Sequence, residues 1–474
     1  MTSGLKKIAG LALRRFNYYS DPVFWDVRLG RNNAGRFAET WARLNESIPL
    51  SAIKVVRWPR LKHLIERAAE DVVLYAEEYA RNGVSPRDIR SEEDLCRLPA
   101  IKKTDFKRYL SRHRDHSHKN AVWRAKEGLT SGSTGEPFRF FLDDAYSVER
   151  VAMGNRIWRW AGVEVQAPKI LCAPESARNY YPNLVFLHPH FIQERKEDYI
   201  NTIRASGARL IFGSPLMTFD LLRTIEEAGV NDIAFDVAVL GGHAVAPGLR
   251  KYFKERFGCE VFEFYAAGET RMIGIECEAH RGLHLQEETA VVEVVDERGL
   301  PLPLGKIGRV LVTSLNNQVM PFIRYDIGDI GVMLPGECPC GRTSRRIFVE
   351  GRTNEGLLVT PDGESLSPAV LRDILDAYFE SFQRYQLVQT ALQKFTLSLV
   401  PTNTYTPAME REIAAKIKKA VGGSITLTIN RRDSIPPLPS GKFQYFVSNL
   451  WKKKFSPALF ATPSLDERVS RLPK

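Results

Sequence analysis

The apolar positions of the chain follow different periods in different stretches. Between residues 58 and 82 they recur at i, i+3, i+4 and i+7, which predicts one amphipathic helix that ends at Asn82-Gly83. From about 145 to 265, short apolar runs alternate with helical patterns. We expect strands over 167–174, 208–215, 235–242 and 259–269, and helices over 217–229 and 246–258. This alternation predicts an α/β fold with parallel strand pairing.

The pattern changes in the last third of the chain. Over 284–350, apolar and polar residues alternate one by one, which is typical of antiparallel β structure. Beyond Gly351, helical patterns over 367–382 and 408–422 flank strand patterns over 384–390 and 394–401. We therefore expect a large N-terminal domain over 1–353, a small α+β domain over 354–450 and a basic tail over 451–474.

Composition and charge narrow the classes of partner. The chain has 474 residues, 44% of them hydrophobic, and a formal net charge of +11. Such a balance suits nucleotides, coenzyme A (CoA), nucleic acid or an anionic membrane, and equally a solvated basic surface. There is no helix-turn-helix, zinc-finger or aromatic RNA-binding pattern, so we do not expect nucleic-acid binding.

The terminal segments and the cysteines indicate where in the cell the protein is expected. The apolar run within residues 1–21 is too short and too charged for a signal peptide or a membrane span. We expect a helix packed on the domain, with contact of the basic termini to a membrane surface as the alternative. Six cysteines without a secretory pattern predict no disulfide framework and a cytoplasmic protein.

One loop carries candidate phosphate-binding chemistry. The segment LTSGSTGEPFRFF, residues 129–141, holds Gly132 and Gly135, which allow backbone conformations closed to other residues. Successive N–H groups in such a loop form an anion-binding concavity, to which Ser131, Ser133 and Thr134 add hydroxyl groups. The loop lacks the lysine that ends a Walker motif. By itself it is equally compatible with a polar hairpin turn.

Other candidate groups follow at strand ends further along the chain. They are Gly241-Gly242-His243, the segment Tyr265 to Glu269, the segment FIRYDIGDIG with Arg324, Asp326 and Asp329, then Arg352, and finally Lys442. Loops at strand ends are where α/β sheets bind ligands. Each group alone also has a structural explanation: Asp326 or Asp329 as a turn cap, Arg352 as an ion-pair partner, Lys442 as a solvated lysine.

Together, in this order, the motifs resemble those of the adenylate-forming superfamily of acyl-CoA ligases. The similarity is greatest to the phenylacetate–CoA ligase branch and its relatives among capsular polysaccharide proteins. It runs from about residue 55 to 450 and includes LPAIKKTDF, residues 98–106. The resemblance implies an α/β adenylation domain with a distorted β-barrel, followed by a mobile α+β lid domain.

The resemblance also implies a role for each candidate residue. A cradle for the ATP phosphates would comprise Thr130, Ser131, Gly132, Ser133, Thr134 and Gly135. The adenine and acyl groups would pack against Gly241, Gly242 and Tyr265. Asp329 would accept hydrogen bonds from the ribose, with Arg352 nearby, and Glu269 would bind Mg²⁺. Catalysis would rest on Lys442, Glu269 and Thr134.

Three positions depart from the family's pattern. Asn354-Glu355 stands at the interdomain hinge, where relatives usually carry two aspartates, which puts the thioester half-reaction in doubt. Gly268 replaces a hydroxyl residue beside Glu269, with Thr270 on the other side. Glu136 stands where some relatives have lysine.

Cysteines and histidines predict a second, structural site. Cys277, His280 and His284 lie in one segment, and Cys338 and Cys340 in another. Three thiolates and one imidazole form the closed tetrahedral site of structural zinc. Some phenylacetate–CoA ligase relatives bind zinc through a similar set, which favours His284, although Cys-x-x-His also suits His280. The alternative is two reduced cysteine clusters that never meet.

We therefore expect an enzyme that adenylates a small carboxylic acid, with an aromatic acid favoured, using ATP and Mg²⁺, and transfers the acyl group to CoA. Transfer to an amine, a sugar or a carrier protein is the first alternative. A non-catalytic partner in polysaccharide biosynthesis is the second. The oligomeric state stays open, a dimer being one option.

Overall fold

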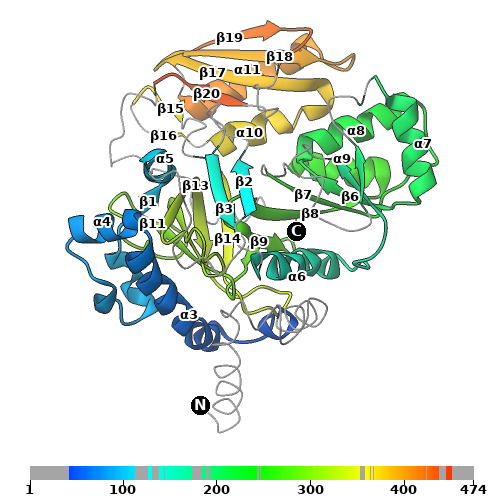
Figure 1. Cartoon of the computed structure of the whole chain (residues 1–474). Coiled ribbons are helices and arrows are strands. Elements are labelled where there is room, and N and C mark those ends of the chain that lie inside the picture. The colour runs from blue at the N-terminus through cyan, green and yellow to red at the C-terminus, as the bar shows by residue number, and fades with distance from the viewer. Residues whose placement is uncertain are drawn as a thin grey trace.

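The structure is a computed structural model that describes residues 42–112, 126–130, 138–142, 145–172, 184–187, 192, 194–242, 245, 247–352, 358–362, 365–366, 368–422, 424–436 and 445–450. Figure 1 shows a large N-terminal body and a smaller C-terminal unit, made of β15 to β20 with α10 and α11, on one side of it. Among the described helices, none is long and apolar enough to cross a membrane.

The N-terminal helical region differs from the single helix predicted over 58–82. Two helices, α3 (Leu50–Asp71) and α4 (Val73–Arg81), are separated at Val72. Val72 is buried and takes an extended conformation, so its side chain packs into the core at the cost of helical continuity. The predicted end is confirmed, because Asn82 caps α4 and Gly83 has a positive φ of 62°. Short 3-10 helices follow at Pro86–Asp88 and Glu92–Arg97.

The parallel half of the central sheet confirms the predicted α/β alternation. Its order is β5-β4-β6-β7-β8, with each neighbouring pair parallel. The bounds are β4 (Lys169–Cys172), β5 (Leu184–Leu187), β6 (Leu210–Gly213), β7 (Val237–Gly241) and β8 (Glu260–Ala267). The helices of this half are α6 (Ala145–Trp160), α7 (Lys196–Ser206), α8 (Pro215–Glu227) and α9 (Pro247–Phe257).

Strand β7 shows why this half is stable. All five of its residues are buried, because both faces of the sheet are covered. Ala238 and Leu240 belong to the core shared with α7, α8 and α9. Val237 and Val239 belong to the opposite core, which includes Trp158 of α6. The carboxyl ends of the parallel strands therefore emerge from a rigid two-sided core.

The antiparallel half continues the same sheet in the order β8-β9-β10-β14-β13-β12-β11. Its bounds are β9 (Arg271–Glu276), β10 (Leu283–Leu285), β11 (Ala290–Val295), β12 (Ile307–Ser314), β13 (Tyr325–Leu334) and β14 (Arg346–Arg352). The antiparallel prediction is thus confirmed. Among the described residues the pairings form an open path, and the distorted barrel stays a prediction.

Two short elements approach this half from earlier in the chain. Strand β1 (Ile101–Lys102) pairs in parallel with β13, placing Ile101 opposite Tyr325, and leads directly into α5 (Lys103–Arg112). Strands β2 (Lys126–Thr130) and β3 (Phe138–Leu142) form an antiparallel hairpin whose last pair is Thr130 and Phe138. The candidate phosphate loop is therefore the connection of a hairpin, and the two interpretations of it are compatible.

The C-terminal unit has a hydrophobic core of its own, built from residues between 358 and 446. Its sheet has the order β19-β18-β17-β20. The elements are β15 (Leu358–Val359), β16 (Ser365–Leu366), α10 (Pro368–Asp376), a 3-10 turn (Phe379–Ser381), β17 (Phe382–Ala391), β18 (Lys394–Pro401), α11 (Pro407–Val421), β19 (Thr426–Arg431) and β20 (Phe446–Ser448). The α+β prediction is confirmed, although the first helix is shorter than expected.

Candidate functional site

Glu269 lies in the turn that connects β8 to β9, and its side chain is buried. The hydroxyl of Tyr325, at the start of β13, donates a hydrogen bond of 2.7 Å to Glu269 Oε1. A buried carboxylate needs such a partner, and hydrogen bonds to an ionised group are among the strong ones. The arrangement fixes one oxygen of a carboxylate predicted to bind Mg²⁺.

Asp329 lies on β13, four residues beyond Tyr325, and is also buried. The hydroxyl of Tyr265, on β8, donates a hydrogen bond of 2.6 Å to Asp329 Oδ2. In the β13–β14 ladder Asp329 stands directly opposite Arg352. The structure therefore brings three of the predicted nucleotide residues, Tyr265, Asp329 and the backbone of Arg352, to one place.

Thr130 ends β2 and lies next to the turn that carries Glu269. A Cβ atom added at Gly268, the neighbour of Glu269, would stand 3.5 Å from Thr130 Cγ2. The buried hydroxyl of Thr270, on the other side of Glu269, has no hydrogen-bond partner among the described residues. An acidic oxygen and an unsatisfied buried hydroxyl beside the phosphate-loop strand are a donor set that suits Mg²⁺ bound to phosphate.

Lys103 joins this cluster and is absent from the predicted set. Its Nζ donates a hydrogen bond of 3.1 Å to Thr130 Oγ1 and lies 5.2 Å from the centre of the Phe138 ring. The β1–β13 pairing positions it, since Lys103 directly follows β1. It thus brings positive charge to the hairpin whose loop holds Glu136 in place of lysine. The LPAIKKTDF motif was the available signal, but it carried no indication of where the ammonium would lie.

Gly241 ends β7 and Gly242 follows it, and each is required for a different reason. A Cβ at Gly241 would lie 2.5 Å from the ring of Phe264, so a side chain there would displace that ring. Gly242 has a φ of 88°, which favours glycine. The Phe264 ring in turn stacks on Phe212, with centroids 5.1 Å apart and planes 8° from parallel. The predicted adenine and acyl surface therefore lies at the carboxyl ends of β6, β7 and β8.

Two charged residues of the FIRYDIGDIG segment have structural partners. Arg324 is buried and pairs with Glu293 at 3.0 Å, despite an unusual φ of 45°. Asp326 pairs with Arg309 at 2.6 Å. These contacts give Asp326 a structural role.

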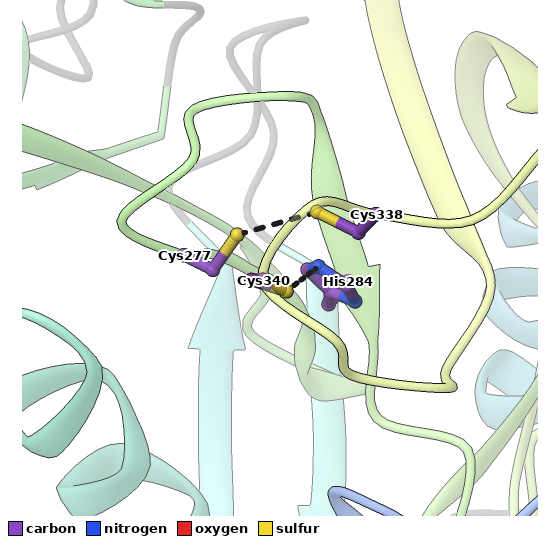
Figure 2. A group of neighbouring side chains, drawn as sticks. All are labelled: Cys277, His284, Cys338 and Cys340. Atoms are coloured by element: carbon purple, nitrogen blue, oxygen red, sulfur yellow. Dashed lines mark hydrogen bonds between the residues drawn. The ribbon is translucent and has the colours of Figure 1, made fainter.

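Cys277, His284, Cys338 and Cys340 converge in a second cluster, called here the Cys/His cluster. Their ligand atoms all lie within 4.8 Å of one another. Figure 2 shows the four side chains gathered in one place. The Sγ atoms of Cys277 and Cys338 are 3.7 Å apart, and Cys340 Sγ is 3.4 Å from His284 Nε2. Two thiolates bound to one tetrahedral zinc lie about 3.8 Å apart, from Zn–S bonds of about 2.3 Å. The spacing thus fits a zinc ion.

The electrostatics of this cluster also fit metal ligation. Burial, with the charges of Arg346 and Arg342, lowers the pKa of His284 to about 4, which keeps the imidazole neutral at pH 7. Burial raises the pKa of Cys277 and of Cys338. Burial opposes ionisation of Cys340 too, but hydrogen bonds from Arg342 bring its pKa below the usual value. A cation would favour the thiolate forms of all three.

Neighbouring side chains hold His284 in place. Its Nδ1 lies 3.0 Å from Ser344 Oγ, and its ring meets Trp160 edge-to-face with centroids 5.5 Å apart. The Arg342 guanidinium lies 4.2 Å from the centre of the Trp160 ring. Such outer contacts orient the ring of a metal ligand.

The alternative ligand His280 lies elsewhere. Its Nε2 is 3.2 Å from Glu260 Oε1 and its Nδ1 is 3.3 Å from Glu276 Oε1. The structure therefore brings His284, not His280, to the three cysteines.

Several predicted residues lie outside the described part of the chain. They are Ser131, Gly132, Ser133, Thr134, Gly135, Glu136, His243, Asn354, Glu355 and Lys442, together with the side chain of Arg352. Their assigned roles stay predictions. The same holds for the N-terminal segment and the C-terminal tail.

Known proteins resemble this chain in sequence. Residues 358–449 match the model of the CapK C-terminal domain. The phenylacetate–coenzyme A ligase of Thermus thermophilus is 26% identical over 448 residues, which span 84% of this chain and 97% of the relative. The phenylacetate–coenzyme A ligase of Escherichia coli is 24% identical over 428 residues, which span 82% and 94%.

Solved structures share the fold. The crystal structure of 2-hydroxyisobutyryl-CoA ligase in the postadenylation state, in complex with 2-HIB-AMP, superposes with a TM-score of 0.73 at 18% identity and covers 90% of this chain and 94% of that one. An open conformation of the same ligase, in complex with 2-HIB-AMP and CoA, gives 0.60 at 19% identity, with 85% and 93% covered. The chain is thus similar in sequence to phenylacetate–coenzyme A ligases along most of its length, shares the fold of a solved acyl-CoA ligase, and carries a segment that matches the CapK C-terminal domain.

Proposed function

We propose that the protein is an ATP-dependent, AMP-forming acid–CoA ligase. One observation carries the proposal: two buried acids that are distant in sequence, Glu269 and Asp329, are each hydrogen-bonded to a tyrosine of the other's segment, and Gly268, the neighbour of Glu269, lies beside Thr130 at the start of the predicted phosphate loop. A site with one acid for a metal–triphosphate, one acid for a ribose and a glycine-rich loop suits ATP. The relatives named phenylacetate–coenzyme A ligase support CoA as the acceptor.

The reaction has two steps. A carboxylate oxygen of the acid attacks the α-phosphorus of ATP, a P–O bond forms, and pyrophosphate leaves. The CoA thiol then attacks the acyl carbon, a C–S bond forms, and AMP leaves with its bonding electrons. Backbone N–H groups of the 131–135 loop and the ammonium of Lys442 stabilise the charge that develops on the phosphates. Lys442→Ala should abolish adenylation and spare turnover of preformed acyl-adenylate.

The two carboxylates have distinct tasks in this proposal. Glu269 offers a carboxylate oxygen to Mg²⁺, which when bound neutralises phosphate charge and aligns the triphosphate. Asp329 accepts hydrogen bonds from the ribose hydroxyls and fixes the nucleoside. Arg352, opposite Asp329 in the ladder, adds a contact nearby. Lys103 adds charge at Thr130, where the loop begins.

We also propose that the Cys/His cluster binds a structural zinc ion. All four potential ligands are protein side chains, which leaves no position for a substrate and suits a closed site. All six cysteines are free, which also supports a reducing, cytoplasmic location. Zinc would join the segment after β9 to the β13–β14 connection. Metal analysis of the purified protein, expected at one zinc per chain, tests this.

The acid is proposed to be small and aromatic, on the strength of the phenylacetate-named relatives. A pyrophosphate-release screen over aromatic, branched and fatty acids, with and without CoA, tests the function. We expect release that requires both ATP and one class of acid, and mass spectrometry of an acyl-CoA product. If the product is instead an acyl-amine or an acyl-carrier protein, the acceptor is not CoA, but the proposed adenylation step still holds.

A further inference from the structure

The two predicted nucleotide acids share a local sequence pattern. Tyr265 to Glu269 and Tyr325 to Asp329 are both Tyr-x-x-Gly-acid segments. The hydrogen bonds between them cross: Tyr265 donates to Asp329, and Tyr325 donates to Glu269. Each tyrosine therefore holds the acid of the other segment. Family resemblance assigned Tyr265 only to packing, and assigned no role to Tyr325.

All four side chains of this crossed pair are buried. Their exposed fractions are 9% for Tyr265, 1% for Tyr325, 5% for Glu269 and 7% for Asp329. Both tyrosine rings belong to the largest core cluster, and Phe106 contacts Tyr325 with ring centroids 5.7 Å apart. A phenol fixed in a packed core can hold its O–H in one direction, and so can hold an acid in one rotamer.

Each acid can accept more hydrogen bonds than the one from its tyrosine. Glu269 Oε1 and Asp329 Oδ2 accept the tyrosine hydroxyls, and a carboxylate has about four acceptor positions in all. Partners of this kind orient metal ligands, and their loss typically weakens metal affinity 10–100-fold. Gly328, with a φ of 78°, lets the backbone turn just before Asp329.

We propose that Tyr325 and Tyr265 are positioning residues of the ATP site. Tyr325 orients Glu269 toward the metal–triphosphate, and Tyr265 orients Asp329 toward the ribose hydroxyls. Because the bonds cross, the segment that carries Glu269 also holds Asp329 in place, and the segment that carries Asp329 also holds Glu269 in place. The inference rests on the proposed function, and it predicts which end of ATP each hydroxyl serves.

Calorimetric binding of ATP separates the two roles without catalysis. The metal ratio is the affinity for ATP with Mg²⁺ divided by the affinity for ATP without Mg²⁺. The ribose ratio is the affinity for ATP divided by the affinity for 2′,3′-dideoxy-ATP. Tyr325→Phe should reduce the metal ratio about 10- to 100-fold and leave the ribose ratio unchanged. Tyr265→Phe should reduce the ribose ratio about tenfold and leave the metal ratio unchanged.

Tyr75→Phe is the matched control. Tyr75 is fully buried in the same core, and its hydroxyl donates to the Pro321 carbonyl at 2.7 Å and accepts from the Ile323 amide at 2.9 Å. Its removal should change neither ratio. Thermal unfolding of all three variants shows whether a general loss of packing explains any change.

The outcomes separate this inference from the proposed function. If each variant lowers both ratios equally, or neither ratio, or if Tyr75→Phe gives the same result, the positioning roles are refuted while ATP binding stands. A wild-type protein that binds no ATP overturns the function and the inference together. The metal ratio of Tyr325→Phe tests the Tyr325–Glu269 pair, and the ribose ratio of Tyr265→Phe tests the Tyr265–Asp329 pair. If one variant misfolds, the other can still refute the proposal.

Discussion

Tyr265, Glu269, Tyr325 and Asp329, called here the proposed nucleotide cluster, lie on the same two hairpins as the Cys/His cluster but differ from it in chemistry. Glu269 lies in the β8–β9 turn and Cys277 directly follows β9. Asp329 lies near the start of β13, and Cys338 lies in the connection from β13 to β14. Each hairpin thus carries an acid of one cluster and a cysteine of the other.

The difference between the clusters lies in what their side chains leave available. In the proposed nucleotide cluster each acid accepts a hydrogen bond from a tyrosine, and a carboxylate can accept several such bonds, so it can also bind a ligand. In the Cys/His cluster the four ligand atoms face one another. The first arrangement suits substrate binding, and the second suits a metal that fixes the two hairpins. Substitutions in the two clusters should therefore have separable effects on activity and stability.

The largest effect should come from Glu269→Gln. The amide keeps the size of the side chain but loses the charge that would meet Mg²⁺, so ATP–pyrophosphate exchange should fall about a thousandfold. Thermal unfolding should change little. Glu255→Gln, at an exposed position of α9, is the matched control and should retain full exchange. Equal activity of the two variants would remove Glu269 from the proposed site.

Cys338→Ser should have the opposite effect, a loss of stability with little loss of exchange activity. Loss of one ligand should release zinc and reduce the free energy of unfolding by about 3 kcal/mol, because metal loss is among the most damaging single changes. Chelator treatment of the wild type should give the same loss. Exchange activity per folded molecule should stay within a few-fold of the wild type. The control Cys96→Ser removes a thiol outside both clusters, and a similar loss of stability there would argue against a metal.

Lys103→Ala should produce a smaller, specific defect. Removal of the ammonium beside Thr130 should raise the KM for ATP about tenfold, the size of one charge-assisted hydrogen bond of about 1.5 kcal/mol. Lys102→Ala, which removes the adjacent exposed lysine, should leave KM unchanged. Kinetics at saturating acid measure both. A KM for ATP that rises equally in the Lys103 and Lys102 variants would indicate a general effect of surface charge.

The smallest effect should come from the contact between the domains. Arg384 of β17 pairs with Asp220 of α8 at 3.2 Å, and both side chains are 36% exposed. Such a pair contributes at most about 1 kcal/mol. Asp220→Asn should therefore shift the ratio of exchange to thioester formation by a few-fold. Glu410→Gln, which removes a pair with Arg431 inside the C-terminal unit, should not shift it.

Much of the fold is predictable from local sequence, because its elements carry clear periodic patterns. The strands near 169–172, 210–213, 237–241 and 260–267 and the C-terminal helices and strands lie where the apolar pattern puts them. The break at Val72 was not predicted, because the apolar period of 58–82 continues across it. Only the tertiary packing of Val72 determines that the helix stops.

The site was predictable in its residue types but not in its contacts. The motifs identify Glu269, Asp329 and the four cluster ligands, and the structure selects His284 over His280. The position of Lys103 depends on the pairing of β1 with β13, and the role proposed for Tyr325 depends on the crossed hydrogen bonds. Both are contacts between distant segments, which no local sequence pattern specifies. The repeated Tyr-x-x-Gly-acid pattern was the one visible sign that the two segments act together.

ATP–pyrophosphate exchange by the wild-type protein tests the central claim most directly. With radiolabelled pyrophosphate, ATP, Mg²⁺ and a panel of carboxylic acids, we predict exchange that requires one class of acid and that falls about a thousandfold in Glu269→Gln. Labelled ATP that forms without an acid, or no exchange with any acid of the panel while the protein is folded, would contradict it.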